Sequence, residues 1–375
     1  MWFEYQAFSL KSTNMASVVQ DSKFIDIFRT FFVGFNLARI KTLAEMIQAL
    51  SAARSVNLVK VAAGMNRKVS PENTYRRIQR FIHDIRLESH LLAPFILRLA
   101  GIKAPYTLIL DRTNWEFGKA KINFLMLSVL GNGWSIPILW MLLPKKGNSN
   151  EEERIELMNR FMAIFGKGVI YDLLADREFI GDTWIKYLID AVIPFDIRIR
   201  ANMKVNSNGQ MIRVSRLFRK SNPDRPVTIF HQVMMGTNLV YLQGQWIINS
   251  KTEQREWLII CTYCHPGMSI KRYAGRWYIE NMFKDMKSNG FQLECTHLTR
   301  LERLDTLMSI LAIAYTWMIR IGMWVKKVRP RIFKKKKHGR PAKSIFRGGL
   351  DEFMHSIHTL NFRLMRKWIK FLSCT

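Results

Sequence analysis

Apolar residues recur at the spacing of an α-helix through most of residues 1–100, with a clear run at residues 36–54. A further helix is expected to begin at Ser70, because a serine caps the free N–H groups of a first turn and Pro71 is suited to the first helical position. The region therefore predicts a bundle of helices.

The helix after Pro71 carries basic residues beside its apolar ones, namely Arg76, Arg77 and Arg80. It follows a shorter helical run at residues 57–65 and a turn. A short helix, a turn and a basic helix form the outline of a helix-turn-helix DNA reader. Any basic amphipathic helix on a bundle gives the same pattern, so a purely structural role stays open. We interpret residues 1–100 as a helical DNA-binding domain in which these arginines contact DNA.

Near Pro105 the pattern changes to short apolar runs of strand length. Two of these runs end in an aspartate, Asp111 and Asp176, and two others are joined by Gly131-Asn132-Gly133, a hairpin signal. The expected order of strand, hairpin, helix, strand, helix and strand covers residues 107–110, 121–143, 150–165, 168–175, 183–190 and 194–200. Alternation of this kind predicts a layered α/β fold.

Three further regions follow the first part of this core, which we place at residues 101–204. Short β-type runs and polar turns predict a β-rich insertion at residues 205–262, with runs at 227–233, 238–242, 246–248 and 257–261. Helical periodicity resumes at residues 263–300, which we assign to the core again. Residues 301–375 form a helical and basic C-terminal region.

The charge balance narrows the function. The chain has 375 residues, with 58 Lys and Arg against 29 Asp and Glu, so its formal net charge is +29. A hydrophobic content of 48% is enough for a sizeable core, which excludes a disordered polycation. A folded protein this basic is expected to bind nucleic acid. Four cysteines make no disulfide framework, and no secretory signal is evident, so we expect a protein of the reducing cytoplasm.

Two C-terminal segments allow more than one interpretation. Residues 307–325 are apolar over about the ~20 residues that cross a bilayer, although Arg320 lies among them. A buried core helix explains this run better than a membrane-associated protein does. Residues 326–347 hold eleven basic residues and no acid, which is typical of a solvated, mobile tail that contacts the phosphate backbone.

A polar stripe of four residues carries the chemistry. On an ideal helix with Tyr273 at 0°, Arg276 falls at about 300°, Glu280 at about 340° and Lys287 at about 320°. A row of surface ion pairs would give the same stripe. The opposite, apolar face would contain Ile279, Met282 and Met286.

Carboxylates at strand ends add to this stripe. Asp111 and Asp176 would meet at the carboxyl edge of a sheet. Together with Glu280 they are the hard oxygen ligands that a pair of divalent cations requires for phosphodiester chemistry. Asp172 is a rival ligand, because it lies four residues before Asp176 and faces the same side of the strand. We expect other acids nearby to be solvated or paired with cations: Glu116, Glu178 and Asp285.

The stripe follows the Y-(2)-R-(3)-E-(6)-K pattern and resembles that of bacterial insertion-sequence transposases, the IS-four family of DDE enzymes, which includes Tn-five-like transposases. The resemblance extends to LILDRTNWEFG around Asp111, LLADREFIG around Asp176, and the segments GFQLECTHL and HGRPAKSIFRGG. The separations, 176 − 111 = 65 and 280 − 176 = 104, leave room for a β-rich insertion before Glu280. The likeness covers roughly residues 105–350.

The resemblance implies an RNase H-like core whose DDE triad, Asp111, Asp176 and Glu280, is catalytic and binds two Mg²⁺ ions, with Mn²⁺ as a substitute. It implies cut-and-paste transposition: nicking at the transposon end, a DNA hairpin, its opening and strand transfer. The partners would be double-stranded DNA, as terminal inverted repeats and target DNA, and a second copy of the chain in a homodimer.

The family also implies residues that hold the DNA. Tyr273, Arg276 and Lys287 would contact phosphates near the cleaved end. Trp257 would stack on a flipped base, with Trp246 as the second choice. One motif remains. Residues 261–265 resemble a haem-attachment box and, together with two later residues, could be drawn as a zinc site, but we disfavour both interpretations. The cysteines and histidines concerned are Cys261, Cys264, His265, Cys295 and His297.

Two other functions remain compatible with the sequence. One is a metal-dependent nuclease that cuts DNA without joining it. The other is a DNA-binding protein with no turnover, such as a decayed transposase.

Overall fold

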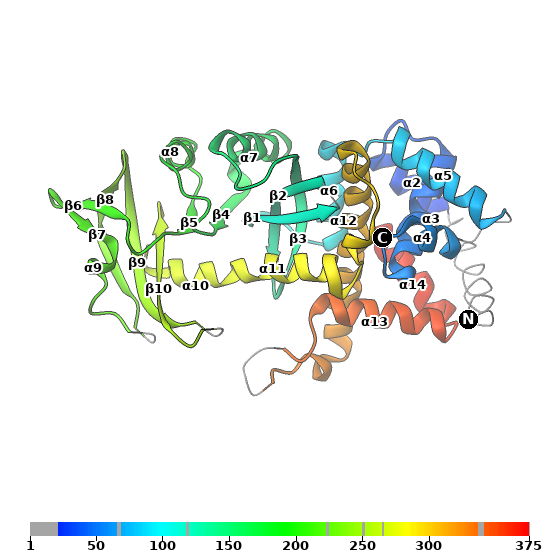
Figure 1. Cartoon of the computed structure of the whole chain (residues 1–375). Helices are drawn as coiled ribbons and strands as arrows, with labels where there is room; N and C mark the ends of the chain where they lie inside the picture. The colour runs from blue at the N-terminus through cyan, green and yellow to red at the C-terminus, as the bar shows by residue number, and fades with distance from the viewer. Residues whose placement is uncertain are drawn as a thin grey trace.

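A computed structural model describes residues 22–65, 69–117, 120–222, 225–249, 252–264, 266–336 and 341–374. The chain forms an elongated molecule with a β-rich end, a central α/β layer and a helical end that holds the C-terminus (Figure 1).

The N-terminal region is helical, as expected. Ser70 caps α5 by accepting a hydrogen bond from the Asn73 backbone N–H at 3.3 Å, and Pro71 is the first helical residue. Residues 66–68 of the expected turn, and the first 21 residues, lie outside the described residues. The helices are α2 (Ser22–Phe31), α3 (Leu37–Ala53), α4 (Leu58–Gly64), α5 (Pro71–Asp84) and α6 (Ser89–Ala100).

The central layer is a sheet in the order β3-β2-β1-β4-β5. β1 pairs antiparallel with β2 and parallel with β4, which pairs parallel with β5. Figure 1 shows α7 and α8 on one face of this layer and a long helical rod on the other. The strands are β1 (Tyr106–Phe117), β2 (Ala120–Gly131), β3 (Trp134–Leu143), β4 (Ile170–Ala175) and β5 (Phe195–Arg198), with helices α7 (Glu151–Phe165) and α8 (Asp182–Asp190).

The segment expected to be β-rich continues this sheet, because β10 pairs antiparallel with β5 and the ten strands form one ladder. Two runs expected as separate strands are a single strand, β9, that passes through Gly244. Gly244 does not break the strand; it makes room for Phe218, whose ring would lie 2.6 Å from an added Cβ. The elements are β6 (Lys204–Ser207), β7 (Gln210–Arg213), α9 (Val214–Leu217), β8 (Val227–Met235), β9 (Asn238–Ile248) and β10 (Arg255–Thr262).

The long rod was expected to be one α-helix and instead changes type along its length. It consists of α10 (Ser269–Tyr273), the 3-10 turn η3 (Ala274–Arg276), α11 (Trp277–Lys284) and the π-helical turn η4 (Asp285–Asn289). Gly275 sits in the 3-10 turn, where an added Cβ would come within 2.5 Å of Leu130 at the end of β2. The rod therefore approaches the sheet most closely just before Glu280.

The apolar run at residues 307–325 belongs to α12 (Leu301–Val328). This helix is long and apolar enough to cross a membrane, but 83% of its apolar window is buried inside the protein. It packs against α3, α6, α13 and β3 as a central helix of the chain. The membrane-associated interpretation is therefore not supported by its packing.

The basic segment after α12 is only partly the solvated tail that its composition predicts. Phe333, in the 3-10 turn η6 (Pro330–Phe333), is 9% exposed, and Arg329 forms an ion pair with the buried Glu352. Lys343 and Arg347 pair with Asp351 of α13 at 2.7 and 2.8 Å. These residues of the basic segment are held in place because other segments supply apolar and acidic partners for their side chains. The remaining helices are α13 (Ile345–His358) and α14 (Phe362–Leu372).

Candidate active site

The sheet register brings the two sequence-predicted aspartates together. Leu110 of β1 is opposite Ala175 of β4 in the parallel ladder, so Asp111 and Asp176 follow side by side. The expectation that Asp111 ends its strand is wrong, because β1 continues to Phe117 by pairing with β2. Only the parallel ladder stops there, and this places both carboxylates where β1 and β4 diverge.

The rod supplies the other side of the site. Arg276 Nη1 donates to Asp111 Oδ2 at 2.9 Å, and Arg276 Nη2 forms an ion pair with Glu280 one turn further on. The Tyr273 hydroxyl donates to Asp176 Oδ1 at 3.2 Å. The Arg276 guanidinium also lies 5.7 Å from the centre of the Tyr273 ring. Three acids that are far apart in sequence are thus gathered around one arginine and one tyrosine.

Burial differs among these groups. The side chains of Asp111 and Arg276 are 13% and 14% exposed, whereas that of Glu280 is 47% exposed. Burial raises the pKa of Asp111 to about 7, with smaller contributions from the charges of Glu178 and Asp176 and against the opposing effect of Arg276. Taken together, the three carboxylates of the site carry more negative charge than Arg276 alone offsets.

This charge excess fits a divalent cation in chemistry, because carboxylate oxygens are the ligands that Mg²⁺ prefers. The spacing does not form a ready metal centre: among the described residues, no group of three acidic, histidine or cysteine side chains could hold a metal ion. The reason is that the Arg276 guanidinium stands between Asp111 and Glu280. Arg276 Nε is buried and has no hydrogen-bond partner among the described residues, so this side chain has donor capacity to spare.

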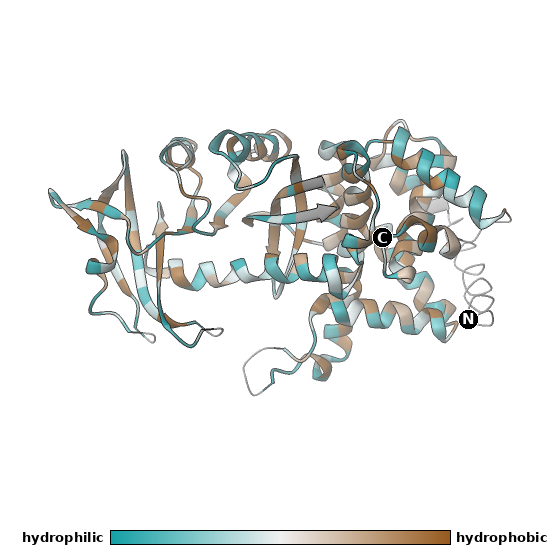
Figure 2. Ribbon diagram, in the orientation of Figure 1, coloured by the Kyte–Doolittle hydropathy of each residue, from teal (hydrophilic) through white to brown (hydrophobic). Residues whose placement is uncertain are grey.

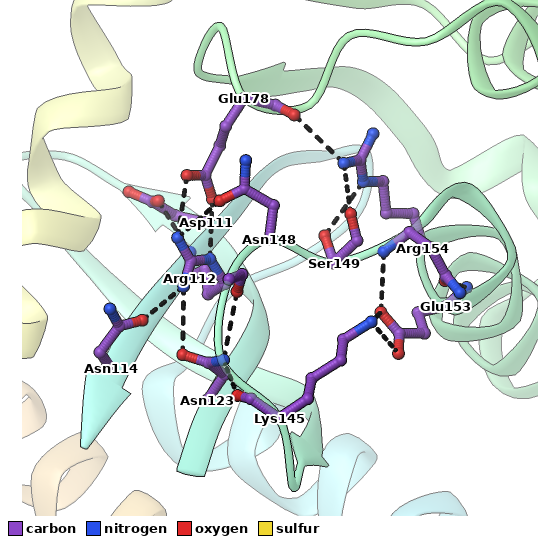
Figure 3. A network of polar contacts seen from close by, with 12 residues as sticks. Asp111, Arg112, Asn114, Asn123, Lys145, Asn148, Ser149, Glu153, Arg154 and Glu178 are labelled. Carbon is purple, nitrogen blue, oxygen red and sulfur yellow. Dashed lines mark hydrogen bonds and ion pairs between the residues drawn. The ribbon is translucent and has the colours of Figure 1, made fainter. Parts of the chain in front are cut away.

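A polar network beside Asp111 was not anticipated from the sequence (Figure 3). Its centre is Arg112, which binds both carboxylate oxygens of Glu178 at 3.2 Å. Arg112 also donates to Asn123 at 3.1 Å and to Asn148 at 2.9 Å, and it contacts Asn114. Glu178 is therefore paired, as expected. The position of Arg112 directly after Asp111 was the one feature of the sequence that could have indicated this network.

The same network fastens two loops that border the site (Figure 3). Arg154 of α7 donates to the Ser149 carbonyl at 2.6 Å and to the Glu178 carbonyl at 3.1 Å. Asn123 donates to the carbonyls of Lys145 and Gly147. The loop after β3 and the loop after β4, which carries Asp176, are thereby held together.

Asp172, the rival ligand, belongs to a different cluster. Its carboxylate is 3% exposed and accepts from Arg272 Nε at 2.9 Å, and Arg272 also pairs with Asp196 at 2.6 Å. Burial and the neighbouring Asp196 raise the pKa of Asp172. Because Arg272 lies between two almost completely buried carboxylates, neither is available to a metal ion. Arg272 was not among the residues predicted from the sequence. Its position four residues, or one helical turn, before Arg276 was the signal that could have indicated it.

The end of the rod contains two charged residues with different surroundings. Lys287 lies in the π-helical turn, and its Nζ donates to the Asn114 carbonyl of β1 at 2.6 Å. Asp285 was expected to be solvated or paired with a cation, and this is wrong: it is 7% exposed, and burial raises its pKa to about 7. The expected apolar face is confirmed, since Ile279, Met282 and Met286 are all buried.

The two candidate tryptophans lie together. Trp257 of β10 is opposite Trp246 of β9, and their rings stack with centroids 3.5 Å apart. The adjacent residue, Glu256, lies 4.0 Å from Arg177, which follows Asp176. Both tryptophans are half-buried. Because side chains alternate along a strand, they lie on the opposite face of the sheet from Glu256.

The three arginines of α5 do not share one face. Arg76 and Arg80 are exposed, whereas Arg77 is half-buried and donates to Thr42 of α3 at 3.2 Å. The cysteines form no metal centre among the described residues; His265 lies outside them.

Comparison with protein-family models matches residues 102–317 to the transposase DDE domain. The matched span runs from just before β1 into α12, contains Asp111, Asp176 and Glu280, and covers more than half of the chain. No curated protein matches the sequence. The chain therefore belongs to the DDE transposase family, whose members are enzymes of DNA transposition.

Proposed function

We propose that this DDE transposase moves an insertion sequence by cut-and-paste transposition, with Asp111, Asp176 and Glu280 as its catalytic residues. One observation supports this most strongly. Arg276 and Tyr273 join the three carboxylates around a single helical rod, where strands β1 and β4 diverge. The sheet order β3-β2-β1-β4-β5 supports an RNase H-like core, and the polar stripe supports membership of the IS-four group.

The three carboxylates would hold two Mg²⁺ ions, or Mn²⁺ in their place. When bound, such ions activate the attacking oxygen and stabilise the leaving oxygen of a phosphodiester. Arg276 would then release at least one carboxylate, and its guanidinium would turn to a DNA phosphate, which it can bind in bidentate fashion. Tyr273 keeps Asp176 in place through its hydroxyl.

Each step is a displacement at phosphorus. Water attacks the phosphorus at the transposon end, the bond to the 3′ oxygen breaks, and a 3′-hydroxyl and a 5′-phosphate result. That 3′-hydroxyl loses its proton and attacks a phosphorus of the opposite strand. The bond from this phosphorus to the 3′ oxygen of the flanking DNA breaks, so the element's end closes as a hairpin and the flank leaves with a 3′-hydroxyl. Water then opens the hairpin, and the freed 3′-hydroxyl joins target DNA by the same displacement.

DNA contacts would come from several elements. Arg276 and Lys287 would bind phosphates near the cut, and a flipped base would stack on Trp257 and its partner Trp246, whose rings are stacked on one another. The helical N-terminal region would bind terminal inverted repeats through the exposed arginines of α5. The active complex would be a homodimer that holds both ends and target DNA.

The test uses the purified full-length chain and labelled duplexes made from both flanks of its coding region. With Mg²⁺, we expect a hairpin product at the element's end and joining to a supercoiled plasmid, and EDTA should abolish both. Nicks without hairpin or joining would indicate a nuclease instead. Specific binding without any cleavage would indicate a DNA-binding protein that has lost turnover.

A further inference from the structure

A cationic groove of about 700 Å³ runs along the exposed face of α5. One wall is contributed by α5 and the other by the first turn of α12, so the groove joins two segments far apart in sequence. Figure 2 shows hydrophilic residues along the outer side of α5. The groove is lined by Asn73, Arg76, Gln79, Arg80, His83 and Arg303.

The phase of α5 explains why these residues share a face. At 100° per residue, the five that α5 contributes fall within an arc of about 120°. The buried residues of the helix, including Ile78 and Phe81, fall on the opposite side and pack into the bundle. Arg77 lies at the edge of the arc and is bound to Thr42, so it belongs to the bundle and not to the groove.

The chemistry of this face suits duplex DNA. Asn and Gln amides pair in bidentate fashion with adenine in the major groove, and that groove is wide enough to admit an α-helix. Arg76 is paired only with the exposed Glu72, at 2.8 Å, an ion pair that costs little to exchange for a phosphate. Across the groove, Arg303 Nε is buried and has no hydrogen-bond partner among the described residues.

The groove is fixed relative to the catalytic sheet. The C-terminal end of α5 is bound to α12, because Thr306 donates to the Ile85 carbonyl at 2.8 Å and accepts from Arg86 at 3.3 Å. One residue earlier on α12, Asp305 accepts from Trp140 of β3 at 2.7 Å. A duplex held in the groove would therefore have a defined position relative to Asp111 and its partners.

We propose that Asn73 and Gln79 read base edges in the major groove of the bound duplex, while Arg303 holds a phosphate of the same duplex. The two amides would then determine sequence specificity. The contacts of α5 with α12 would fix the position of α5 relative to the catalytic sheet. This inference rests on the proposed function only in taking duplex DNA as the substrate, and it requires no cleavage.

The experiment measures binding of the full-length chain in Ca²⁺ to avoid cleavage. Wild-type protein first selects its preferred sequence from a library of duplexes with a randomised central stretch. Affinity for the selected duplex and for a scrambled duplex is then measured over a range of salt concentrations. The variants are Asn73→Ala, Gln79→Ala and Arg303→Gln. Gln210→Ala and Arg363→Gln serve as matched controls on exposed sites elsewhere, and thermal melting verifies that each variant is folded.

Each amide variant should lose on the order of tenfold or more in affinity for the selected duplex and nothing for the scrambled one. When each amide variant selects duplexes from the same library, the selected sequences should no longer have a preferred base at the positions that the lost amide contacts. Arg303→Gln should weaken both duplexes equally and reduce the salt slope by about 1. The proposal is overturned if the amide variants select the wild-type sequence, if they weaken both duplexes equally, or if wild type selects no sequence. If only the proposed catalytic function is wrong, the cleavage assay fails and the binding results in Ca²⁺ are unchanged.

Discussion

Two clusters in this protein are each built around an arginine between two carboxylates, and they differ in their access to solvent. Arg272 and Arg276 lie one turn apart on the rod, and each bridges two carboxylates. The aspartates of β4 repeat the arrangement, since Asp172 belongs to the first cluster and Asp176 to the second. The inner cluster is Asp172, Arg272 and Asp196; the outer cluster is Asp111, Arg276, Glu280 and Tyr273 with Asp176.

The difference lies in access. Both carboxylates of the inner cluster are almost completely buried, at 3% and 0% exposed, whereas Glu280 of the outer cluster is 47% exposed. A sealed ion-pair cluster must remain intact, because a buried charge without its partner is costly. An open cluster can exchange its arginine for a metal ion or a phosphate. The same residue types therefore serve structure in one place and, as we propose, chemistry in the other.

The largest effect is expected at the open cluster. Glu280→Gln removes the charge but keeps the size of the side chain, so cleavage should fall on the order of 10²–10³-fold or more. Binding measured in Ca²⁺ should be almost unchanged. Glu156→Gln on the exposed face of α7 is the control, and its cleavage rate should match wild type. Cleavage by Glu280→Gln at the wild-type rate would contradict the catalytic assignment.

The two arginines should differ in their effect on stability. Arg272→Met leaves Asp172 and Asp196 buried without a cation, so the free energy of unfolding should fall by about 3–5 kcal/mol. Arg276→Met should cost less, because the exposed Glu280 can be hydrated. Urea denaturation of both variants measures the difference. Equal losses would show that access does not distinguish the clusters.

Asp285 tests the effect of burial on a carboxylate without the effect of an ion pair, because it is buried and forms no ion pair among the described residues. Burial raises its pKa to about 7, so its contribution to stability is fully present below the unfolded-state value near 4 and is lost as pH rises through about 7. Asp285→Asn should therefore stabilise the protein at pH 8 relative to pH 5, by about 1 kcal/mol or more. Thermal melting at the two pH values tests this. The exposed control, Asp190→Asn, should show no such dependence.

The smallest effect is expected at the contact between α5 and α12. Thr306→Val removes one buried hydrogen bond to Ile85, which should cost about 1 kcal/mol of stability. If α12 sets the position of the reading helix relative to the catalytic sheet, cleavage by this variant should spread over neighbouring phosphates. Product mapping at single-nucleotide resolution measures the spread, with Ser309→Ala on the same helix as the control. A single cut site would argue against coupling through α12.

Local chemistry made much of the fold predictable from the sequence. Ser70 and Pro71 marked the start of α5, because capping depends only on residues within one turn. Spacing on the rod correctly indicated that Ile279, Met282 and Met286 are buried, but it did not indicate that Asp285 is. The polar stripe and its separation from Asp111 and Asp176 were enough to indicate a DDE transposase, which the match over residues 102–317 confirms.

Contacts between distant segments were beyond such reasoning. Nothing local shows that the carboxylates bound by Arg272 are sealed whereas one of those bound by Arg276 is exposed; neighbouring strands and helices decide this. The sequence by itself determined the elements, the acidic residues and the basic character of this protein. Only the tertiary structure decided which charges are buried, because burial depends on every segment that packs around a side chain and not on its neighbours in the chain.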